Sequence, residues 1–460
     1  MKKDRRTFIK KSAIGAGGIV LGAYKFSQSA KSYNSILGAN DRINICVIGT
    51  RGRGFGHLRS WASMAEKHKI QVKTICEVDE TLLPERVEAV ENLQGIKPAI
   101  EYDMRKVFDD QSIDAVSIAT PNHWHALATI WAIQAGKDVY VEKPCSHNVF
   151  EGRKMVEAAR KYNRIVQSGF QNRSRANVRE AMEFLHSGGI GEVYMAKGLC
   201  YKPRKSFGIA ADEEPPKTLH YDLWLGPAQW RPYNEKKGHY NWHWHWDTGN
   251  GDIGNQGVHQ FDIARWGMNK NEHPVKVSSS GGYFKYVKDE CSQETPNTQT
   301  AVLQYADGKI MQFEVRGLST GGEANDNVKI GNLFYGTEGW LELNKGKWQS
   351  YLGPNNEPGP ASNSEKKETS QTDVYLNAPS GQEHYINFIN AIRSRKPQDL
   401  ECEIEEGHYS TVLPLLSNIS FRLGRSLTFN IENENFENDN EANKMLTREY
   451  RKPFEVKNMI

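Results

Sequence analysis

The sequence predicts an α/β protein with two domains, the first built on a doubly wound parallel sheet and the second on a mostly antiparallel sheet. Three observations support this prediction. The chain has 460 residues, which is long for one compact core. Apolar runs alternate with helical patterns up to about residue 170, as in parallel sheets with right-handed crossovers. Beyond that point, residues 311–315 alternate apolar and polar side chains, as in a strand with one wet face.

The first domain, at residues 42–170, consists of five apolar runs and the helices between them. We expect strands at 43–48, 70–76, 115–120, 139–141 and 165–170 and helices at about 57–67, 81–93, 123–135 and 150–162. The first strand runs into a glycine-rich turn, and the fourth ends on Glu142-Lys143-Pro144. The carboxyl ends of parallel strands meet at one edge of the sheet, so these two segments should border one ligand crevice.

The second domain, at residues 171–425, should be an α+β unit. Asp307-Gly308, just before the strand at 311–315, is a strong hairpin signal. Further strands are expected near 193–201, 275–284, 299–306 and 327–344, and helices near 174–187, 256–267, 380–394 and 404–423. Residues 353–372 have the polar composition of a surface loop, and residues 426–460 should form a polar C-terminal tail.

The first 30 residues look like an export signal. Residues 4–10 resemble the twin-arginine consensus, and thirteen uncharged residues lie between Lys11 and Lys25. This stretch is shorter than the roughly 20 residues of a membrane-spanning helix, so we expect no stable membrane span. We therefore expect the twin-arginine export machinery as a partner and a periplasmic location. An uncleaved anchor or a disordered basic tail are the alternatives.

The net charge of +3 originates in this same segment. Residues 1–30 contain seven basic side chains and one acidic side chain, so the rest of the chain is slightly acidic. That balance predicts no nucleic-acid partner. The six cysteines are scattered without metal-binding spacing, and we expect buried free thiols.

The glycine-rich turn predicts a dinucleotide site. Gly49, Gly52 and Gly54 form G-x-x-G-x-G between a strand and a helix, with Arg51 where a dinucleotide fingerprint has its middle glycine. We expect Arg51 and its neighbour Arg53 to contact the cofactor, Arg51 through the phosphates. A plain tight turn is the alternative.

An acidic residue follows the second strand, at Glu77, with Asp79 nearby. A carboxylate at this position can bind both ribose hydroxyls and would repel a 2′-phosphate. The predicted cofactor is therefore NAD, with NADP less favoured.

Four stretches together resemble the glucose–fructose oxidoreductase/inositol dehydrogenase/MocA (Gfo/Idh/MocA) family of sugar oxidoreductases. They are the glycine turn, Thr120-Pro121-Asn122-His123-Trp124-His125, Glu142-Lys143-Pro144, and residues 251–262 with the sequence GDIGNQGVHQFD. Their order and spacing match over about residues 42–425. The resemblance implies a Rossmann domain, an open-faced antiparallel sheet in the second domain, and a homo-oligomer, either a dimer or a tetramer.

The resemblance also assigns residues to roles. Lys143 would lie beside the nicotinamide, and His259 would be the acid/base acting on a substrate hydroxyl. Asn255 occupies the position where the family usually has an aspartate; an amide can hold the substrate but cannot take a proton. Around the cofactor, we expect Thr120, Pro121, Asn122, His125 and Glu142, of which His125 should reach furthest toward the substrate.

The residues themselves support Lys143 and His259 as catalytic. A lysine at the carboxyl end of a parallel strand points into the crevice, where desolvation and the cationic nicotinamide lower its pKa. An imidazole can accept a proton near neutral pH. Asp262, three residues after His259 on a predicted helix, could orient that imidazole. A solvated Lys143 and a capping or core His259 are the alternatives.

Residues 241–247, with the sequence NWHWHWD, predict a sugar-binding wall. If extended, this segment places three tryptophans on one face and His243, His245 and Asp247 on the other. We assign Trp244 and His245 to substrate binding, together with Gln171 and Arg173 after the fifth apolar run. Plain packing and a metal site on the H-x-H-x-D face are the alternatives, and no metal is assigned.

The leading function is an exported NAD-dependent oxidoreductase acting on a secondary hydroxyl of a sugar or glycoside, with a cofactor that is recycled in the site. A redox-assisted glycosidase, in which transient oxidation permits elimination, is the second hypothesis; its known family lacks Glu-Lys-Pro at this position. The third is a non-catalytic sugar- or partner-binding protein that retains nucleotide.

Overall fold

A computed structural model describes residues 42–286, 290–344, 346–362 and 382–456. The expected signal segment and residues 363–372 of the expected 353–372 loop lie outside these ranges. Within the described part of the chain, no helix has the length and apolar character needed to cross a bilayer.

The first sheet has six strands in the order β3-β2-β1-β4-β5-β6. They are β1 (Ile43–Ile48), β2 (Ile70–Cys76), β3 (Ala99–Glu101), β4 (Ala115–Ile118), β5 (Asp138–Glu142) and β6 (Val166–Gly169). The pairs β1–β4, β4–β5, β5–β6 and β2–β3 are parallel. The predicted doubly wound sheet is confirmed, and its winding reverses between β1 and β4, where ligands of such sheets bind.

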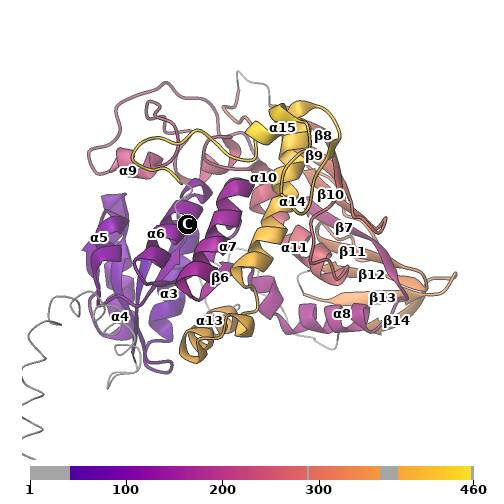
Figure 1. Ribbon diagram of the computed structural model, residues 1–460, viewed down its shortest axis with the longest axis horizontal. Coiled ribbons are helices and arrows are strands. Elements are labelled where there is room, and N and C mark those ends of the chain that lie inside the picture. Colours follow the sequence, from indigo (N-terminus) through magenta and orange to yellow (C-terminus); the bar gives the residue numbers. More distant parts are fainter. Residues whose placement is uncertain (1–41, 287–289, 345, 363–381, 457–460) are drawn as a thin grey trace, which may run out of the picture. The chain divides into compact units, whose positions relative to one another are not determined.

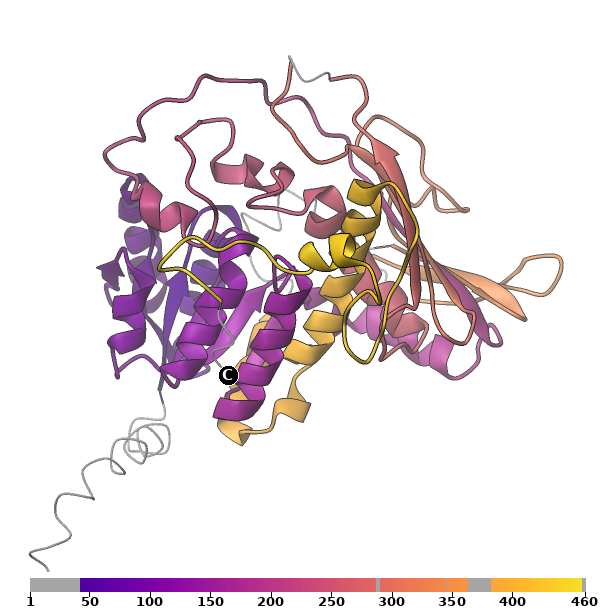
Figure 2. The same ribbon diagram turned by 45° about the horizontal axis from the view of Figure 1, so that its top comes forward.

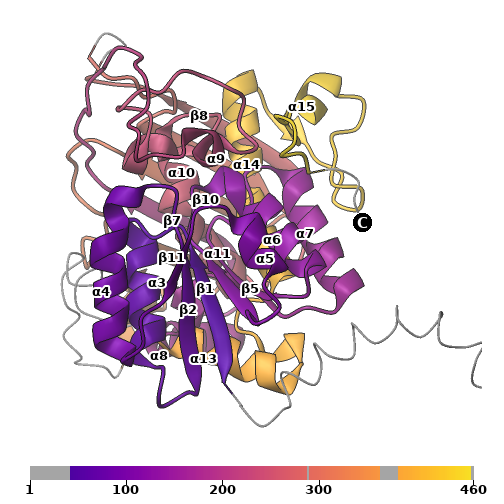
Figure 3. The same ribbon diagram turned by 90° about the vertical axis from the view of Figure 1, so that its left-hand side faces the viewer.

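Helices cover both faces of this sheet (Figure 3). The helices α3 (Gly52–Ser63) and α4 (Leu83–Gln94) lie on one side, and α5 (Met104–Asp109), α6 (His125–Gln134) and α7 (Val149–Tyr162) on the other. The strands β1, β4 and β5 are almost fully buried, which explains their continuous apolar sequence. The short elements β3 and α5 were not predicted.

The second sheet has nine strands in the order β14-β13-β12-β11-β7-β10-β9-β8-β15. They are β7 (Val193–Tyr201), β8 (Lys276–Gly282), β9 (Thr298–Gln304), β10 (Ile310–Arg316), β11 (Ile330–Gly336), β12 (Gly339–Asn344), β13 (Trp348–Leu352), β14 (Glu357–Ala361) and β15 (Leu427–Thr428). Only β7 and β10 pair in parallel among the registered pairs of this sheet, so the mostly antiparallel prediction is confirmed. The strand β14 contradicts the expectation of a loop from residue 353 onward.

One face of the second sheet is covered by helices (Figure 1). They are α8 (Ala176–His186), α11 (Gly257–Gly267) and α14 (Ile404–Leu423). In β10 the predicted alternation is confirmed, because Met311, Phe313 and Val315 are buried beneath these helices while the residues between them are not. Asp307-Gly308 lies in the predicted β9–β10 hairpin.

The C-terminal segment is packed against the molecule and is not a polar tail. Its strand β15 pairs with β8, and its short helix α15 spans Asn440–Lys444. Phe429, Phe436 and Phe454 are at most 3% exposed. The Phe454 ring meets Trp124 of the first domain edge-on, with ring centroids 5.4 Å apart. The helix expected near residues 380–394 is confirmed as α13 (Gln382–Ser394).

A long segment at residues 202–250, here called the strap, leaves β7 and crosses to the first domain (Figure 2). It contains α9 (Tyr221–Leu225) and the 3-10 helix η5 (His239–Trp244), and it leads into α10 (Gly251–Asn255). The strap pairs with the chain just after β2, through a bridge between Asp79 and Leu219 and a 2.9 Å hydrogen bond from His220 N to Val78 O. The strap therefore covers the carboxyl edge of the parallel sheet.

Candidate active site

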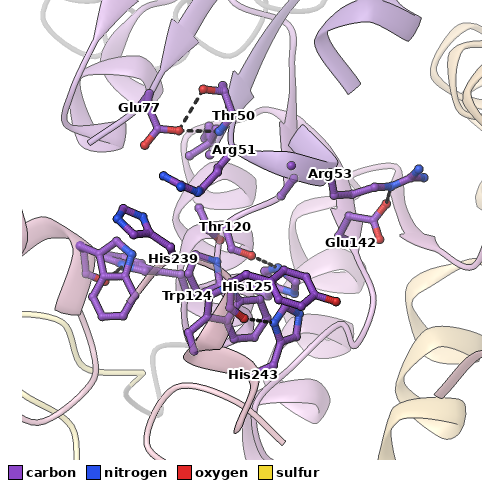
Figure 4. A pocket seen from close by; sticks show the side chains of 18 of the residues that line it. Thr50, Arg51, Arg53, Glu77, Thr120, Trp124, His125, Glu142, His239 and His243 are labelled. Atoms are coloured by element: carbon purple, nitrogen blue, oxygen red, sulfur yellow. Dashed lines mark hydrogen bonds and ion pairs between the residues drawn. The ribbon is translucent and has the colours of Figure 1, made fainter. Parts of the chain in front are cut away.

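A cavity of about 890 Å³ lies between the carboxyl edge of the first sheet and the strap. The first domain lines it with the residues that follow β1, β2, β4 and β5, and the second domain with the strap and the junction of α10 and α11. It is the predicted crevice at the point where the winding of the sheet reverses. Figure 4 shows side chains from the two domains around one space.

The glycine turn is built for close backbone approach. Gly49 has φ +77°, and a Cβ there would lie 2.9 Å from Thr120 Cα. A Cβ on Gly54 would lie 1.8 Å from Gly49 O, so Gly54 lets α3 pack on the turn and does not itself line the cavity. Gly52 faces open space, and α3 starts there without a side-chain cap. Its free amides and positive dipole end suit a pyrophosphate.

Glu77 holds the glycine turn in place through hydrogen bonds. Its Oε2 accepts hydrogen bonds from Thr50 N (2.6 Å) and Thr50 Oγ1 (2.9 Å), and its Oε1 accepts from Val78 N and Asp79 N (Figure 4). Both carboxylate oxygens are thus engaged by the protein, which was not expected for a ribose-binding residue. Glu77 and Asp79 still line the cavity and place negative charge there, which opposes a 2′-phosphate.

The two arginines of the turn have different environments. Arg51, with a side chain 51% exposed, lies 3.4 Å from Asp79 Oδ2 and beside His239 of the strap (Figure 4). It can reach cofactor phosphates. Arg53 instead donates from Nε to Glu142 Oε1 (2.8 Å) and from Nη2 to Tyr385 Oη (3.2 Å). Arg53 lines the cavity but is held by Glu142.

Glu142 is a fixed anion next to Lys143. Its Oε1 also lies 3.0 Å from His57 Nε2 and accepts a 2.8 Å hydrogen bond from Gln171 Nε2. Burial alone would raise the pKa of Glu142, but Arg53 and His57 bring that pKa well below its usual range. Gln171 lines the cavity as predicted, with its amide nitrogen directed at Glu142.

Lys143 reaches across to the second domain. Its Nζ donates to the main-chain oxygen of Asn255 (2.8 Å) and lies 3.4 Å from Asn255 Oδ1. Burial lowers the pKa of Lys143 to about 8, with Arg53 and Lys202 lowering it further and Glu142 opposing. The ammonium is therefore held at the cavity wall in a form that loses its proton near neutral pH.

His259 lies on the same wall. Asn255 ends α10 and His259 lies in the first turn of α11, with Gln256 in helical conformation between the two helices. Residues four apart on a helix share a face, and both line the cavity. The His259 ring meets Phe170 edge-on at 6.1 Å between centroids.

Asp262 and Arg173 have a structural role, which corrects two predictions. Arg173 Nε and Nη2 donate to the Asp262 carboxylate at 3.0 and 2.8 Å, and Ser410 Oγ donates to it at 2.6 Å. Asp262 is thus turned away from His259 and does not orient it. Arg173 is 6% exposed and absent from the cavity wall, so it is not placed to bind substrate.

His125 holds loops together and does not reach for substrate. Its Nδ1 lies 2.7 Å from Pro144 O and its Nε2 lies 2.9 Å from Thr120 O. Burial lowers the pKa of His125, so the neutral ring donates to only one of these oxygens, and its two nitrogens face the loops that follow β4 and β5. His125 still lines the cavity together with Thr120 and Pro121. Asn122 is 1% exposed and outside the cavity wall, contrary to its predicted cofactor role.

The predicted extended face at 241–247 does not form, because residues 239–244 make the 3-10 helix η5. Trp244 and His245 are 4% and 0% exposed and do not line the cavity, so the structure does not bring them to the predicted substrate site. The metal-ligand face is also absent: His245 Nδ1 lies 3.3 Å from Glu294 Oε1, and Asp247 pairs with Arg448.

Trp242 and His243 line the cavity in their place. The two rings stack at 3.6 Å between centroids, and His243 Nδ1 lies 2.6 Å from Tyr240 O. Burial lowers the pKa of His243 to about 3, so the ring is neutral and donates from Nδ1. Its Nε2 is then an acceptor available to a hydroxyl. The aromatic content of 241–247 was the correct signal, but the extended geometry assumed for it selected the wrong residues.

A second group of ligand-type side chains lies elsewhere, at His273, His408 and Glu434. Glu434 Oε1 lies 2.7 Å from His273 Nε2 and 2.8 Å from His408 Nε2. Arg153 of α7 also donates to this carboxylate, with its Nε 3.1 Å from Glu434 Oε2. Arg153 supplies the positive charge that a metal ion would bring, so the group serves as a hydrogen-bonded junction between α7, α14 and the C-terminal segment.

Comparison with known proteins assigns both domains to the same family. A profile described as an oxidoreductase family with an NAD-binding Rossmann fold matches residues 43–170. A second profile, the C-terminal alpha/beta domain of the same family, matches residues 205–314 and 364–456. The two profiles together match well over half of the chain and correspond to its two domains.

Two individual proteins that resemble this chain each share less than a third of their aligned residues with it. A glycosyl hydrolase family 109 protein of Shewanella pealeana is 29% identical over 174 residues, which is 35% of this chain and 37% of that protein. The chain thus aligns with little more than a third of this curated relative. Aldose–aldose oxidoreductase of Caulobacter crescentus, solved with glycerol, has a TM-score of 0.61 and 17% identity, covering 84% of this chain and 100% of that one.

A levoglucosan dehydrogenase solved with NADH and levoglucosan has a TM-score of 0.60 and 19% identity, covering 84% of this chain and 99% of that one. At these identities the structural matches establish the fold. With the profiles of both domains matched over well over half of its length, the chain belongs to the Gfo/Idh/MocA oxidoreductase family and carries its NAD-binding Rossmann domain.

Proposed function

We propose that the protein is an NAD-dependent oxidoreductase that transfers a hydride between the nicotinamide and a carbon bearing a secondary hydroxyl of a sugar or glycoside. One observation carries this proposal. Lys143 Nζ binds the main-chain oxygen of Asn255, four residues before His259, at the wall of the cavity whose other end is the glycine turn. This contact supports Lys143 and His259 as a proton-transfer pair on the wall of one cavity.

The residues divide the chemistry as follows. Bound NAD supplies the acceptor or donor of the hydride. Lys143 takes the proton of the substrate hydroxyl as the carbon is oxidised, which its lowered pKa of about 8 permits. His259 holds the hydroxyl and exchanges the proton with Lys143 or solvent. Asn255 keeps the lysine in place through its main-chain oxygen and can hydrogen-bond the substrate.

The strap supports a sugar as the substrate. Trp242, His243 and Tyr240 give the cavity an aromatic wall with a free imidazole acceptor. Aromatic faces pack on the apolar side of sugar rings, and convergent polar groups fix their hydroxyls.

The test is the NADH absorbance of the purified protein during titration with a panel of sugars and glycosides. We expect bound nucleotide and a rise in NADH absorbance with at least one sugar. Lys143→Met should retain nucleotide and lose the absorbance change, whereas Lys67→Met, at an exposed lysine between α3 and β2, should behave as wild type. Normal turnover in Lys143→Met would refute the role of the lysine.

A redox-assisted glycosidase is the second candidate, favoured by the likeness to glycosyl hydrolase family 109 proteins. It predicts release of an aglycone from a chromogenic glycoside without net accumulation of NADH. The leading proposal predicts oxidation of the sugar with the glycosidic bond intact. Bound nucleotide with neither reaction on any sugar would favour a binding protein.

We also propose that residues 1–30 direct export through the twin-arginine pathway to the periplasm. The motif at residues 4–10 supports this. Replacing Arg5 and Arg6 together by lysine should keep the protein in the cytoplasmic fraction, and unchanged fractionation would contradict the proposal.

We propose a homo-oligomer, either a dimer or a tetramer, formed through the face of the second sheet that the helices leave uncovered. Val302, 38% exposed, pairs in register with Gln312 on this face. Val302→Glu should shift the mass measured by light scattering toward the monomer. A wild-type mass equal to one chain would contradict the proposal.

A further inference from the structure

The substrate end of the cavity carries a positive charge that no side chain of the described residues neutralises. Lys202, the first residue after β7, lines the cavity and is partly buried. Throughout the described ranges its ammonium has neither a hydrogen-bond partner nor an ion-pair partner. By contrast, Lys143 is bonded to Asn255. An ammonium that is partly removed from water without a partner is unfavourable, and an anionic ligand would compensate it.

Lys202 lies in the same electrostatic neighbourhood as the proposed catalytic lysine. Lys202 lowers the pKa of Lys143, and the pKa of Lys202 itself is lowered by burial and by Arg204, with Asp252 opposing. An anion held by Lys202 would therefore sit beside the reacting part of the substrate.

Asp252 favours the charged form of Lys202 but makes its own ion pair with another residue. Asp252 is 3% exposed and bound by both arms of Arg204, with Nε at 2.8 Å from Oδ2 and Nη2 at 2.7 Å from Oδ1. This pair is neutral as a unit, so the charge of Lys202 remains.

Two of the three acidic residues of the cavity wall lie at the nucleotide end, and the third is already paired. Among the described residues that line the cavity, the acidic ones are Glu77, Asp79 and Glu142. Glu77 and Asp79 follow β2 at the nucleotide end, and Glu142 is held by Arg53 and His57. A neutral sugar would leave Lys202 unpaired, whereas a negatively charged one would not.

We propose that the substrate is a sugar acid, with a carboxylate bound by Lys202 while its ring lies against Trp242 and His243. The proposal rests on the proposed function and deepens it by naming the substrate class. An ammonium is a compact point charge that can pair with a carboxylate, whereas phosphate groups are usually held by arginine forks or several donors.

The test compares matched substrates on the NAD-loaded enzyme. The ratio of kcat/KM for methyl glucuronide to that for methyl glucoside is measured, and the same ratio is taken for the galacto pair. We expect the wild type to favour the acid by about ten- to hundredfold, the range of a hydrogen bond to a charged group. Lys202→Met should reduce this ratio at least tenfold, and Lys202→Arg should retain part of it.

Lys205→Met is the matched control, because Lys205 is exposed and three residues further along the strap. It should leave the ratio unchanged. The proposal is overturned if the wild type turns over the neutral sugar at least as well as the acid, or if Lys202→Met leaves the ratio as it was. Either result would leave the proposed oxidoreductase function standing.

A binding measurement distinguishes failure of the anion site from failure of the proposed function. The melting temperature of the NAD-loaded protein is measured with methyl glucuronide and with methyl glucoside. A larger rise with the acid that is lost in Lys202→Met supports the anion site even if no sugar is oxidised, in which case only the proposed function fails. An equal rise with both sugars counts against the anion site. Should Lys202→Met not fold, Lys202→Gln replaces it in both assays.

Discussion

Lys143 should control how sugar oxidation depends on pH. Its pKa is lowered by burial from 10.5 to about 8. At pH 7, a group with that pKa is about 9% neutral, against about 0.03% for an unshifted lysine, a gain of roughly 300-fold in the form that can accept a proton. As pH falls below the pKa, the neutral amine and hence the oxidation rate should decrease tenfold per unit.

The assay is single-turnover reduction of bound NAD by a saturating sugar, followed by NADH absorbance from pH 5 to 10. We expect a rising limb that levels off at or below about pH 8, because the cationic nicotinamide lowers the pKa of the lysine further. Sugar reduction by NADH should show the opposite limb, since it needs the ammonium.

Two variants serve as controls for this profile. Lys143→Arg cannot deprotonate in this range and should be slow at every pH, and Lys143→Met should lose about 10²- to 10⁴-fold in rate. A rate that still rises tenfold per unit up to pH 10, or a wild-type limb preserved in Lys143→Met, would refute the assignment of the base.

Further substitutions test the nucleotide end and the domain junction. Gly54→Ala should abolish retention of NAD, measured by release and chromatography, because its Cβ would lie 1.8 Å from Gly49 O; full retention would contradict the close packing. Asp262→Asn should lower the free energy of unfolding by about 1.5–3 kcal/mol, since it removes the charge of one buried partner of Arg173 and leaves Glu406 as the other carboxylate beside the guanidinium; a change below about 1 kcal/mol in denaturant titrations would count against this. Glu77→Gln should raise the affinity for NADP relative to NAD on the order of tenfold by removing one repulsive charge, and an unchanged ratio in fluorescence titrations would show that the carboxylate does not select the cofactor.

The parallel sheet could be predicted because its strands are buried on both faces and are therefore continuously apolar. The strand β3 and the helix α5 escaped prediction because Ala99–Glu101 is short and mostly exposed, so it leaves no apolar run. The helix α3 begins at Gly52, whereas the sequence suggested a start at about residue 57. The difference arises because Gly52 and Gly54 of the glycine turn already form the first turn of this helix. The C-terminal segment was misjudged because its buried phenylalanines are isolated among polar residues.

The site was predictable where one strand or helix carries the residue, as for Lys143 at the end of β5 and His259 on α11. The position of a site residue was not predictable where a contact with a residue distant in the sequence determines it. Arg173 is withdrawn from the cavity by Asp262, 89 positions away in the chain. The strap has no regular pattern, so the position of His243 depends on the 3-10 helix η5 and could not be read from periodicity.

The most direct test of the account is transfer of a label to the cofactor. A sugar deuterated at the oxidised carbon is mixed with the NAD-loaded protein, and the released nucleotide is analysed by mass spectrometry. The account predicts one deuterium on NADH from the wild type and none from Lys143→Met within the same time. Oxidation of the sugar with no label on the nucleotide would contradict it.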